Sequence, residues 1–202
     1  MEVYIIRHGE TDWNKQCLLQ GQSDIPLNDY GRELARQTAE GLKEIPFDRI
    51  YSSPLIRAYE TAEIIRGDRD MDIITDERIK EIAFGVDEGV HKDKVSENFK
   101  DFFAAPEKYI PPAGGESYQS LLKRAADFVD NELVPLSATA TRVMIVAHGA
   151  LNSALAVYLK GLGVENMWER FIPNCGVNIY EVNGNNFTLI AEGKVYYESD
   201  SR

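Results

Sequence analysis

The sequence contains few cysteines and no long apolar run. Its 202 residues include two cysteines, Cys17 and Cys175, which lie far apart in the chain. Two are too few for a disulfide framework or for a structural zinc site, which takes about four ligands. The longest strongly apolar run, residues 143–147, is far shorter than the ~20 residues that span a bilayer. Glu2 stands where a signal peptide carries a cation. We therefore expect a cytoplasmic protein with no metal, no cofactor and no membrane partner.

Positive charge is also scarce. The chain has 22 Lys and Arg against 33 Asp and Glu, which gives a formal net charge of −11. Such an acidic chain disfavours nucleic acid as a general partner. An anionic ligand must then be held by a local cluster of cations. A chain of this length buries roughly 70% of the surface that its unfolded form exposes, so its core needs no disulfide or structural metal.

Short β-branched runs alternate with stretches of helical periodicity along the chain. This alternation is typical of an α/β fold in which helices cover a mostly parallel sheet. The Asn183-Gly184 pair predicts a hairpin, and therefore an antiparallel edge. We predict a three-layer α/β/α sandwich with a mostly parallel central sheet. Strands are expected at residues 3–7, 49–52, 72–75, 142–147, 177–182 and 187–192, and helices at about 29–44, 53–65, 117–129 and 150–162.

Residues 84–115 interrupt this pattern. The region is less periodic, with Phe99, Phe102 and Phe103 indicating one helix and several Pro and Gly residues predicting a loop. We interpret it as a small cap inserted into a single domain that spans residues 1–202. The phenylalanines are expected to pack in a core rather than to contact a substrate.

Two His-Gly pairs follow predicted strands. An Arg-His-Gly string at residues 7–9 leaves the first strand, and Ala-His-Gly at 147–149 leaves the late apolar strand. The carboxyl ends of parallel strands form the usual binding crevice of an open α/β sheet. Both pairs should therefore face one rim, where glycine lets the backbone approach a ligand closely.

A third strand end adds another cation. Ser53 and Pro54 are typical of a helix N-cap and first turn, and they place Arg57 in a first turn whose free N–H groups favour an anion. Arg7 and Arg57 together with two imidazoles suit a tetrahedral dianion, because planar guanidinium groups match phosphate oxygens in pairs. Any one of these residues alone is more often structural, but three converging segments favour a phosphate site.

In these motifs the sequence resembles the histidine phosphatase superfamily, in its phosphoglycerate-mutase-like branch. The resemblance covers nearly the whole chain and implies an enzyme that transfers a phosphoryl group without a metal. The matching segments, in the family's order, are residues 7–11, Asn14, 19–27, 52–62, 81–89 and 148–149.

The resemblance also implies a role for each matching residue. His8 would attack phosphorus and become a phosphohistidine. Glu81 would protonate the leaving alkoxide and then activate water. The implied catalytic set is His8, Glu81, His148, Arg7 and Arg57, and the implied substrate-binding set is Arg7, Asn14, Gln20, Gly21, Arg57, His148 and Gly149.

The proposed roles set requirements on protonation. A nucleophilic imidazole must be neutral, and Arg7 and Arg57 should lower the pKa of His8 from its reference value of ~6.5. A glutamic acid is ionised at neutral pH, so Glu81 can donate a proton only if burial or the arriving phosphate favours its protonated form. We expect an acidic-to-neutral optimum of activity.

Three functions remain open at this stage. The first is a metal-independent phosphomonoesterase that hydrolyses a small phosphorylated metabolite and releases inorganic phosphate. The second is a phosphoglycerate-type mutase, which is disfavoured because the segment after Trp13-Asn14 departs from the mutase pattern. The third is a non-catalytic phosphate-binding module, against which intact His8 and Glu81 argue. The segment 84–89 carries Asp87 where many relatives have tryptophan, and the sequence does not decide between a monomer and a homodimer.

Overall fold

A six-stranded mixed sheet forms the centre of the computed structural model, which describes residues 1–95 and 99–198. The strand order is β3-β2-β4-β1-β5-β6. The first four of these pair in parallel, whereas β5 pairs antiparallel with both β1 and β6. The predicted antiparallel edge is thereby confirmed. The strands are β1 (Glu2–Arg7), β2 (Arg49–Ser52), β3 (Ile73–Thr75), β4 (Arg142–Ala147), β5 (Val177–Asn183) and β6 (Asn186–Lys194).

Both faces of the central strands are buried. Successive side chains of a strand point to opposite faces, and in β1 Val3 and Ile5 enter one hydrophobic cluster while Tyr4 and Ile6 enter another. A strand buried on both sides reads as a continuous apolar run, which explains the composition of β1 and β4.

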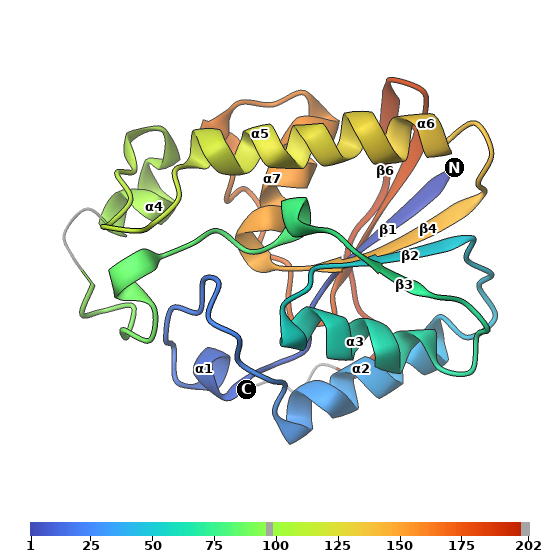
Figure 1. Ribbon diagram of the computed structural model, residues 1–202, viewed down its shortest axis with the longest axis horizontal. Helices are drawn as coiled ribbons and strands as arrows, with labels where there is room; N and C mark the ends of the chain where they lie inside the picture. Colours follow the sequence, from blue (N-terminus) through green and yellow to red (C-terminus); the bar gives the residue numbers. More distant parts are fainter. Residues whose placement is uncertain (96–98, 199–202) are drawn as a thin grey trace.

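Helices cover the two faces of the sheet in separate layers. Figure 1 shows α5 and α7 on one face and α2 and α3 on the other. The predicted three-layer α/β/α arrangement is confirmed. None of the helices in the described ranges is both long and apolar enough to cross a membrane. The helices are α1 (Asp12–Lys15), α2 (Asp29–Gly41), α3 (Ile56–Arg66), α4 (Lys100–Ala104), α5 (Tyr118–Phe128), α6 (Val134–Leu136) and α7 (Gly149–Lys160).

The start of α3 differs from the prediction. The helix begins at Ile56, with Leu55 at the N-cap position, rather than at Ser53 and Pro54. The Ser53 hydroxyl accepts the N–H of Leu55 at 3.3 Å and closes a tight turn ahead of the helix. The N–H of Ile56 donates to a carboxylate oxygen of Asp24 at 2.6 Å. The first free N–H of α3 is therefore satisfied by an acidic side chain of the protein itself.

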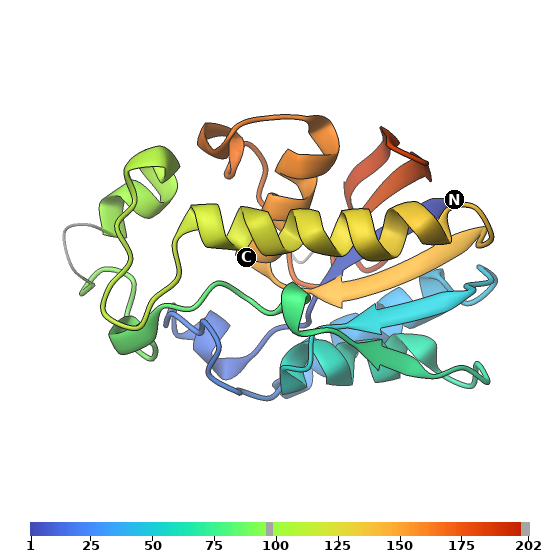
Figure 2. The same cartoon turned by 45° about the horizontal axis from the view of Figure 1, so that its top comes forward.

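The segment 84–115 lies beyond the carboxyl ends of the parallel strands, as Figure 2 shows around α4. Its aromatic side chains divide into two groups. Phe99 and Phe102 are buried and pack face to face at 5.0 Å, as the sequence predicted. Phe103, by contrast, is 51% exposed. Residues 96–98 lie outside the described part of this segment.

Candidate active site

The register of β1 and β4 brings the two His-Gly corners together. Arg7 and Ala147 are register partners at the ends of these parallel strands. The next N–H along β1, that of His8, donates to the carbonyl of Ala147 at 2.9 Å. The rings of His8 and His148 consequently lie with their centroids 5.2 Å apart. Both corners face one rim, as the strand-end pattern predicts.

One main-chain hydrogen bond orients the imidazole of His8. Nδ1 lies 2.6 Å from the carbonyl oxygen of Gly9, and because a carbonyl can only accept, Nδ1 carries the proton. The lone pair of the neutral ring is then on Nε2. The corner is held by the N–H of Gly9, which donates to Thr61 Oγ1 at 3.0 Å, and by the Asn174 amide, which donates to the His8 carbonyl at 2.9 Å.

Two buried arginines lie beside these corners. Nη1 of Arg7 donates to the carbonyl of Ile172 at 2.8 Å. Arg57 is fully buried and donates to the carbonyls of Ser23 at 2.8 Å and Gly21 at 2.7 Å. Within the described residues, Nε of each arginine is buried without a hydrogen-bond partner. Because burying an unpaired charged donor is costly, these groups favour an anion between them.

His148 lies behind this rim and is completely buried. Its backbone occupies the N-cap position of α7. Neither ring nitrogen has a hydrogen-bond partner among the residues that the structure describes. A neutral imidazole has one N–H to donate, so a phosphate oxygen at the rim would satisfy it.

Glu81 reaches the same rim from a different segment. Its carboxylate accepts the N–H groups of Ala150 at 3.2 Å and Leu151 at 3.1 Å, which belong to the first turn of α7, and that of Ile82 at 3.0 Å. A carboxylate is a favourable partner for unpaired N–H groups at a helix N-terminus. Arg124 of α5 donates to the main-chain carbonyl of Glu81 at 3.0 Å and fixes the segment from the other side.

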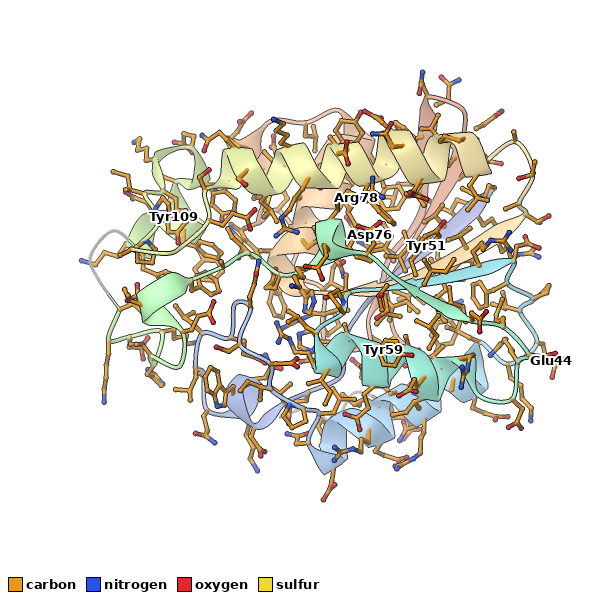
Figure 3. The ribbon with its side chains drawn as sticks, in the orientation of Figure 1. Glu44, Tyr51, Tyr59, Asp76, Arg78 and Tyr109 are labelled. Carbon is orange, nitrogen blue, oxygen red and sulfur yellow. The ribbon has the colours of Figure 1, made fainter. Side chains whose placement is uncertain are left out.

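An ion-pair network holds the chain just before Glu81. Arg78 contacts the carboxylates of Asp76 at 2.6 Å, Asp127 at 2.9 Å and Glu132 at 2.9 Å. Figure 3 shows Asp76 and Arg78 next to each other below α5. The network ties the Glu81 segment to α5, so its position depends on the scaffold rather than on a free loop.

The loop after β1 supplies amide groups. Oδ1 of Asn14 accepts the N–H and the hydroxyl of Thr11, both at 3.1 Å, so the amino group of Asn14 remains for a ligand. Gln20 is 8% exposed, and its Oε1 has no hydrogen-bond partner in the described ranges. Gly21 has φ +52°, and a Cβ there would collide with the carboxylate of Glu88. Glycine is therefore required where this loop presents its carbonyl to Arg57.

These groups line a pocket of about 350 Å³. A volume of this size is typical of small-molecule sites. His148 is not among the lining residues, but its ring centroid lies 5.2 Å from that of His8, which is. The lining includes these predicted site residues: Arg7, His8, Asn14, Gln20, Gly21, Arg57, Glu81 and Gly149.

Comparison with known proteins agrees with this geometry. Residues 3–193 match the model of the histidine phosphatase superfamily, branch 1. The chain belongs to this superfamily. A 2,3-bisphosphoglycerate-dependent phosphoglycerate mutase of Parvibaculum lavamentivorans is 32% identical over 188 residues, which cover 89% of this chain and 90% of the mutase.

Two solved structures resemble this histidine phosphatase over almost their whole length. YhfR of Bacillus stearothermophilus has a TM-score of 0.88 and 34% identity, and the match covers 96% of this chain and 97% of YhfR. Phosphoserine phosphatase of Entamoeba histolytica, solved in complex with phosphoserine, has a TM-score of 0.84 and 29% identity, covering 95% and 96% of the two chains.

Burial and neighbouring cations shift the titration of the site of this histidine phosphatase. Burial lowers the pKa of His8 well below its usual 6.5, and Arg57 and Arg7 lower it further. The pKa of His148 is also lowered well below 6.5, first by burial and then by Arg57 and His8. Burial lowers the pKa of Arg57 to about 10. Both imidazoles are therefore neutral at pH 7, as a nucleophilic His8 requires.

The neutral histidines predict that stability falls as the pH drops below 6.5. Because their pKa values are lowered in the folded state, the unfolded chain binds more protons than the folded chain in this range, and protonation favours unfolding. Each buried histidine then contributes a loss of up to about 1.4 kcal/mol per pH unit. Urea unfolding in phosphate-free buffer at about pH 7.5, 6.5 and 5.5 measures this slope.

The control for this experiment is His91, which is partly exposed in the segment 84–115. We expect His148→Asn to reduce the slope by about half, and the slope of His91→Asn shows what removal of a partly exposed histidine does. An unfolding free energy that stays constant from about pH 7.5 to 5.5 would contradict the neutral, buried state of both imidazoles.

Several residues that shape this site were not found from the sequence. Thr61 accepts the Gly9 N–H and donates its hydroxyl to the carbonyl of Arg57 at 2.7 Å, so it links the His8 corner to α3. Asn174 lies beside Cys175, which has φ +55° and donates its N–H to the Arg7 carbonyl at 2.9 Å. These links join segments far apart in the chain and have no local pattern. At the start of α3, where free N–H groups were expected to favour an anion, the N–H of Ile56 is instead paired with Asp24.

Proposed function

We propose that the protein is a metal-independent phosphomonoesterase of the cytoplasm, which hydrolyses a small phosphorylated metabolite through a phosphohistidine intermediate. One observation carries the proposal. His8 has its Nδ1 proton engaged by Gly9, which leaves the Nε2 lone pair beside two buried guanidinium groups, Arg7 and Arg57, each with an unpaired Nε. A neutral nucleophile next to buried cations suits attack on a phosphoryl dianion.

In the first step, Nε2 of His8 attacks phosphorus in line with the ester oxygen. The N–P bond forms, the P–O bond to the leaving group breaks, and Glu81 donates its proton to the departing oxygen. Arg7, Arg57, His148 and the amino group of Asn14 hold the non-bridging oxygens of the phosphoryl group, where charge is redistributed. The substrate dianion brings negative charge next to the Glu81 carboxylate, and a proton taken up with the substrate relieves that repulsion.

In the second step, water replaces the leaving group. Glu81, now ionised, accepts a proton from the water as its oxygen attacks phosphorus and the N–P bond breaks. Inorganic phosphate leaves, and His8 returns to its neutral form. The segment 84–115, which lies over the carboxyl ends of the strands, acts in this proposal as the cap that selects the leaving group.

A mutase is the second candidate, because a relative of 32% identity carries that name. The two functions differ in what accepts the phosphoryl group from phosphohistidine. A phosphatase gives it to water, whereas a mutase returns it to the carbon skeleton from which it came. The sequence after Trp13-Asn14 favours water as the acceptor.

A steady-state and trapping experiment tests the proposed function. The full chain is incubated in EDTA with a panel of phosphate esters, and inorganic phosphate is measured. With a ³²P-labelled ester, an acid-labile, base-stable phosphoenzyme should appear on rapid quenching. Isomerisation of a phosphoglycerate without phosphate release would identify a mutase. Tight phosphate binding without turnover of any ester would identify a binding module and overturn the enzymatic proposal.

A further inference from the structure

The pocket has two chemically different ends. The phosphate end contains His8, Arg7, Arg57 and Glu81. The other end is mainly apolar, and three aromatic side chains that line it form what we call the aromatic wall. The aromatic wall consists of Phe103, Trp168 and Phe171. Leu18 and Leu19, from the loop after β1, also line the pocket.

The aromatic wall is held in place by hydrogen bonds and ring contacts. Nε1 of Trp168 donates to the carbonyl of Phe102 at 2.7 Å and to the hydroxyl of Tyr118 at 2.9 Å. The ring of Phe103 lies 4.8 Å from that of Trp168 and 4.9 Å from that of Phe102. Because Phe102 and Tyr118 are buried, the Phe103 and Trp168 rings of the wall rest on the core of the protein.

Two members of the wall are unusually exposed for large apolar side chains. Phe103 is 51% exposed and Phe171 is 69% exposed. The ring of Phe171 lies 4.7 Å from the guanidinium carbon of Arg7, so apolar surface begins directly beside the phosphate end. A group of exposed aromatic side chains next to a pocket is typical of a ligand-binding surface. A leaving group attached to the phosphate would cover it.

The charges around the pocket do not favour an acidic leaving group. Among the described residues that line it, Glu10 and Glu81 are acidic, and the cations are Arg7, Arg57 and Lys92. Both arginines belong to the phosphate end. Lys92 is exposed to solvent, where an ion pair contributes little. Among the described lining residues, a carboxylate on the leaving group would therefore find Lys92 as its one cationic partner outside the phosphate end.

We infer that the substrate is a phosphate ester of an alcohol with an aromatic or other flat apolar group, which stacks on the aromatic wall. The inference rests on the proposed function and specifies its substrate class. It separates this chain from relatives whose names specify phosphoserine or phosphoglycerate. Burial of a phenyl ring against such a wall is worth about tenfold or more in binding.

Two esters of primary alcohols test the inference without a difference in leaving-group class. The full chain is assayed with 2-phenylethyl phosphate and with O-phosphoserine. We expect kcat/KM to be at least about tenfold higher for 2-phenylethyl phosphate. Equal values, or a preference for O-phosphoserine, would overturn the inference and leave the proposed phosphatase function intact.

Variants locate the preference in the pocket. Phe103→Ala should lower kcat/KM for 2-phenylethyl phosphate about tenfold and change that for O-phosphoserine less than about twofold. Lys92→Ala should change neither by more than about twofold. Ile110→Ala is the matched control, because Ile110 is 65% exposed in the same segment but does not line the pocket. A loss with Phe103→Ala that is equal for both esters would overturn the inference.

Binding of phosphonates separates recognition from turnover. Calorimetry compares 3-phenylpropylphosphonate with 2-amino-4-phosphonobutyrate, which are the non-hydrolysable counterparts of the two esters. We expect the phenyl compound to bind at least about tenfold more tightly, and Phe103→Ala to abolish most of that difference. If this binding preference were found but neither ester were hydrolysed, the proposed function would fail while the apolar subsite stood.

Discussion

Replacing His8 with alanine abolishes phosphate release, with kcat lowered by roughly 10⁵- to 10⁶-fold, the range seen when a covalent nucleophile is removed. The loss is this large because the proposed in-line attack depends on the Nε2 lone pair of His8. His148, the nearest imidazole, is fully buried and is not among the residues that line the pocket. The variant should also form no ³²P-labelled phosphoenzyme, which quench experiments measure directly.

The His8→Ala variant should still bind phosphate, because Arg7 and Arg57 remain in the pocket. Calorimetric titration with inorganic phosphate is the readout that distinguishes loss of the nucleophile from loss of the fold. His91→Ala is the matched control, since His91 does not line the pocket and its removal should leave kcat unchanged. Residual turnover within about a hundredfold of the wild type would rule out a phosphohistidine at position 8.

Glu81→Gln lowers kcat for an alkyl phosphate by about 10²- to 10⁴-fold, the usual contribution of general acid–base catalysis. The geometry makes this substitution informative. Oε1 accepts the N–H groups of Ile82 and Leu151, and a glutamine can keep both contacts, while the contact from Ala150 to Oε2 is lost. The first turn of α7 should therefore remain in place, and the main change is the loss of proton transfer.

The leaving group decides which step Glu81→Gln slows. With 4-nitrophenyl phosphate, whose leaving group departs without a proton, His8 should be phosphorylated at nearly the wild-type rate, and phosphoenzyme should accumulate because water is no longer activated. Stopped-flow detection of the nitrophenolate burst measures this step. Glu77→Gln, on the same segment but exposed, is the control. An equal slowing of the burst for alkyl and nitrophenyl esters would argue against an acid–base role for Glu81.

The sequence was most informative where strands are buried on both faces. Apolar runs such as 3–7 and 142–147 are stable only as strands of a sheet whose two faces are both covered by helices. The polar residues that follow such parallel strands then lie at one edge of the sheet. This pattern predicts that His8 and His148 lie together, and the register of Arg7 with Ala147 gives the physical reason. Strand ends are local features, so a sequence contains the information needed to find them.

Features that depend on contacts between distant segments were less predictable. The four residues of α1 are too few for helical periodicity, and the helix is fixed instead by the reciprocal bonds of Thr11 and Asn14. The sequence predicts a start of α3 at Ser53 and Pro54, because a local cap was expected there. The first N–H of the helix is paired instead with Asp24, which lies more than thirty positions away in the chain. The exposure of Phe103 could not be separated from the burial of Phe102, because adjacent phenylalanines give the same composition signal.

The main-chain pairing of β1 with β4 has a consequence for how this protein can change. The two imidazoles are positioned by backbone bonds at the centre of the sheet, whereas the surface that we propose contacts the leaving group comes from the segment 84–115 and from Trp168 and Phe171. Mutations that remodel one region need not disturb the other. Substitutions in the segment 84–115, or at Trp168 and Phe171, could therefore change the substrate while the two imidazoles keep their positions.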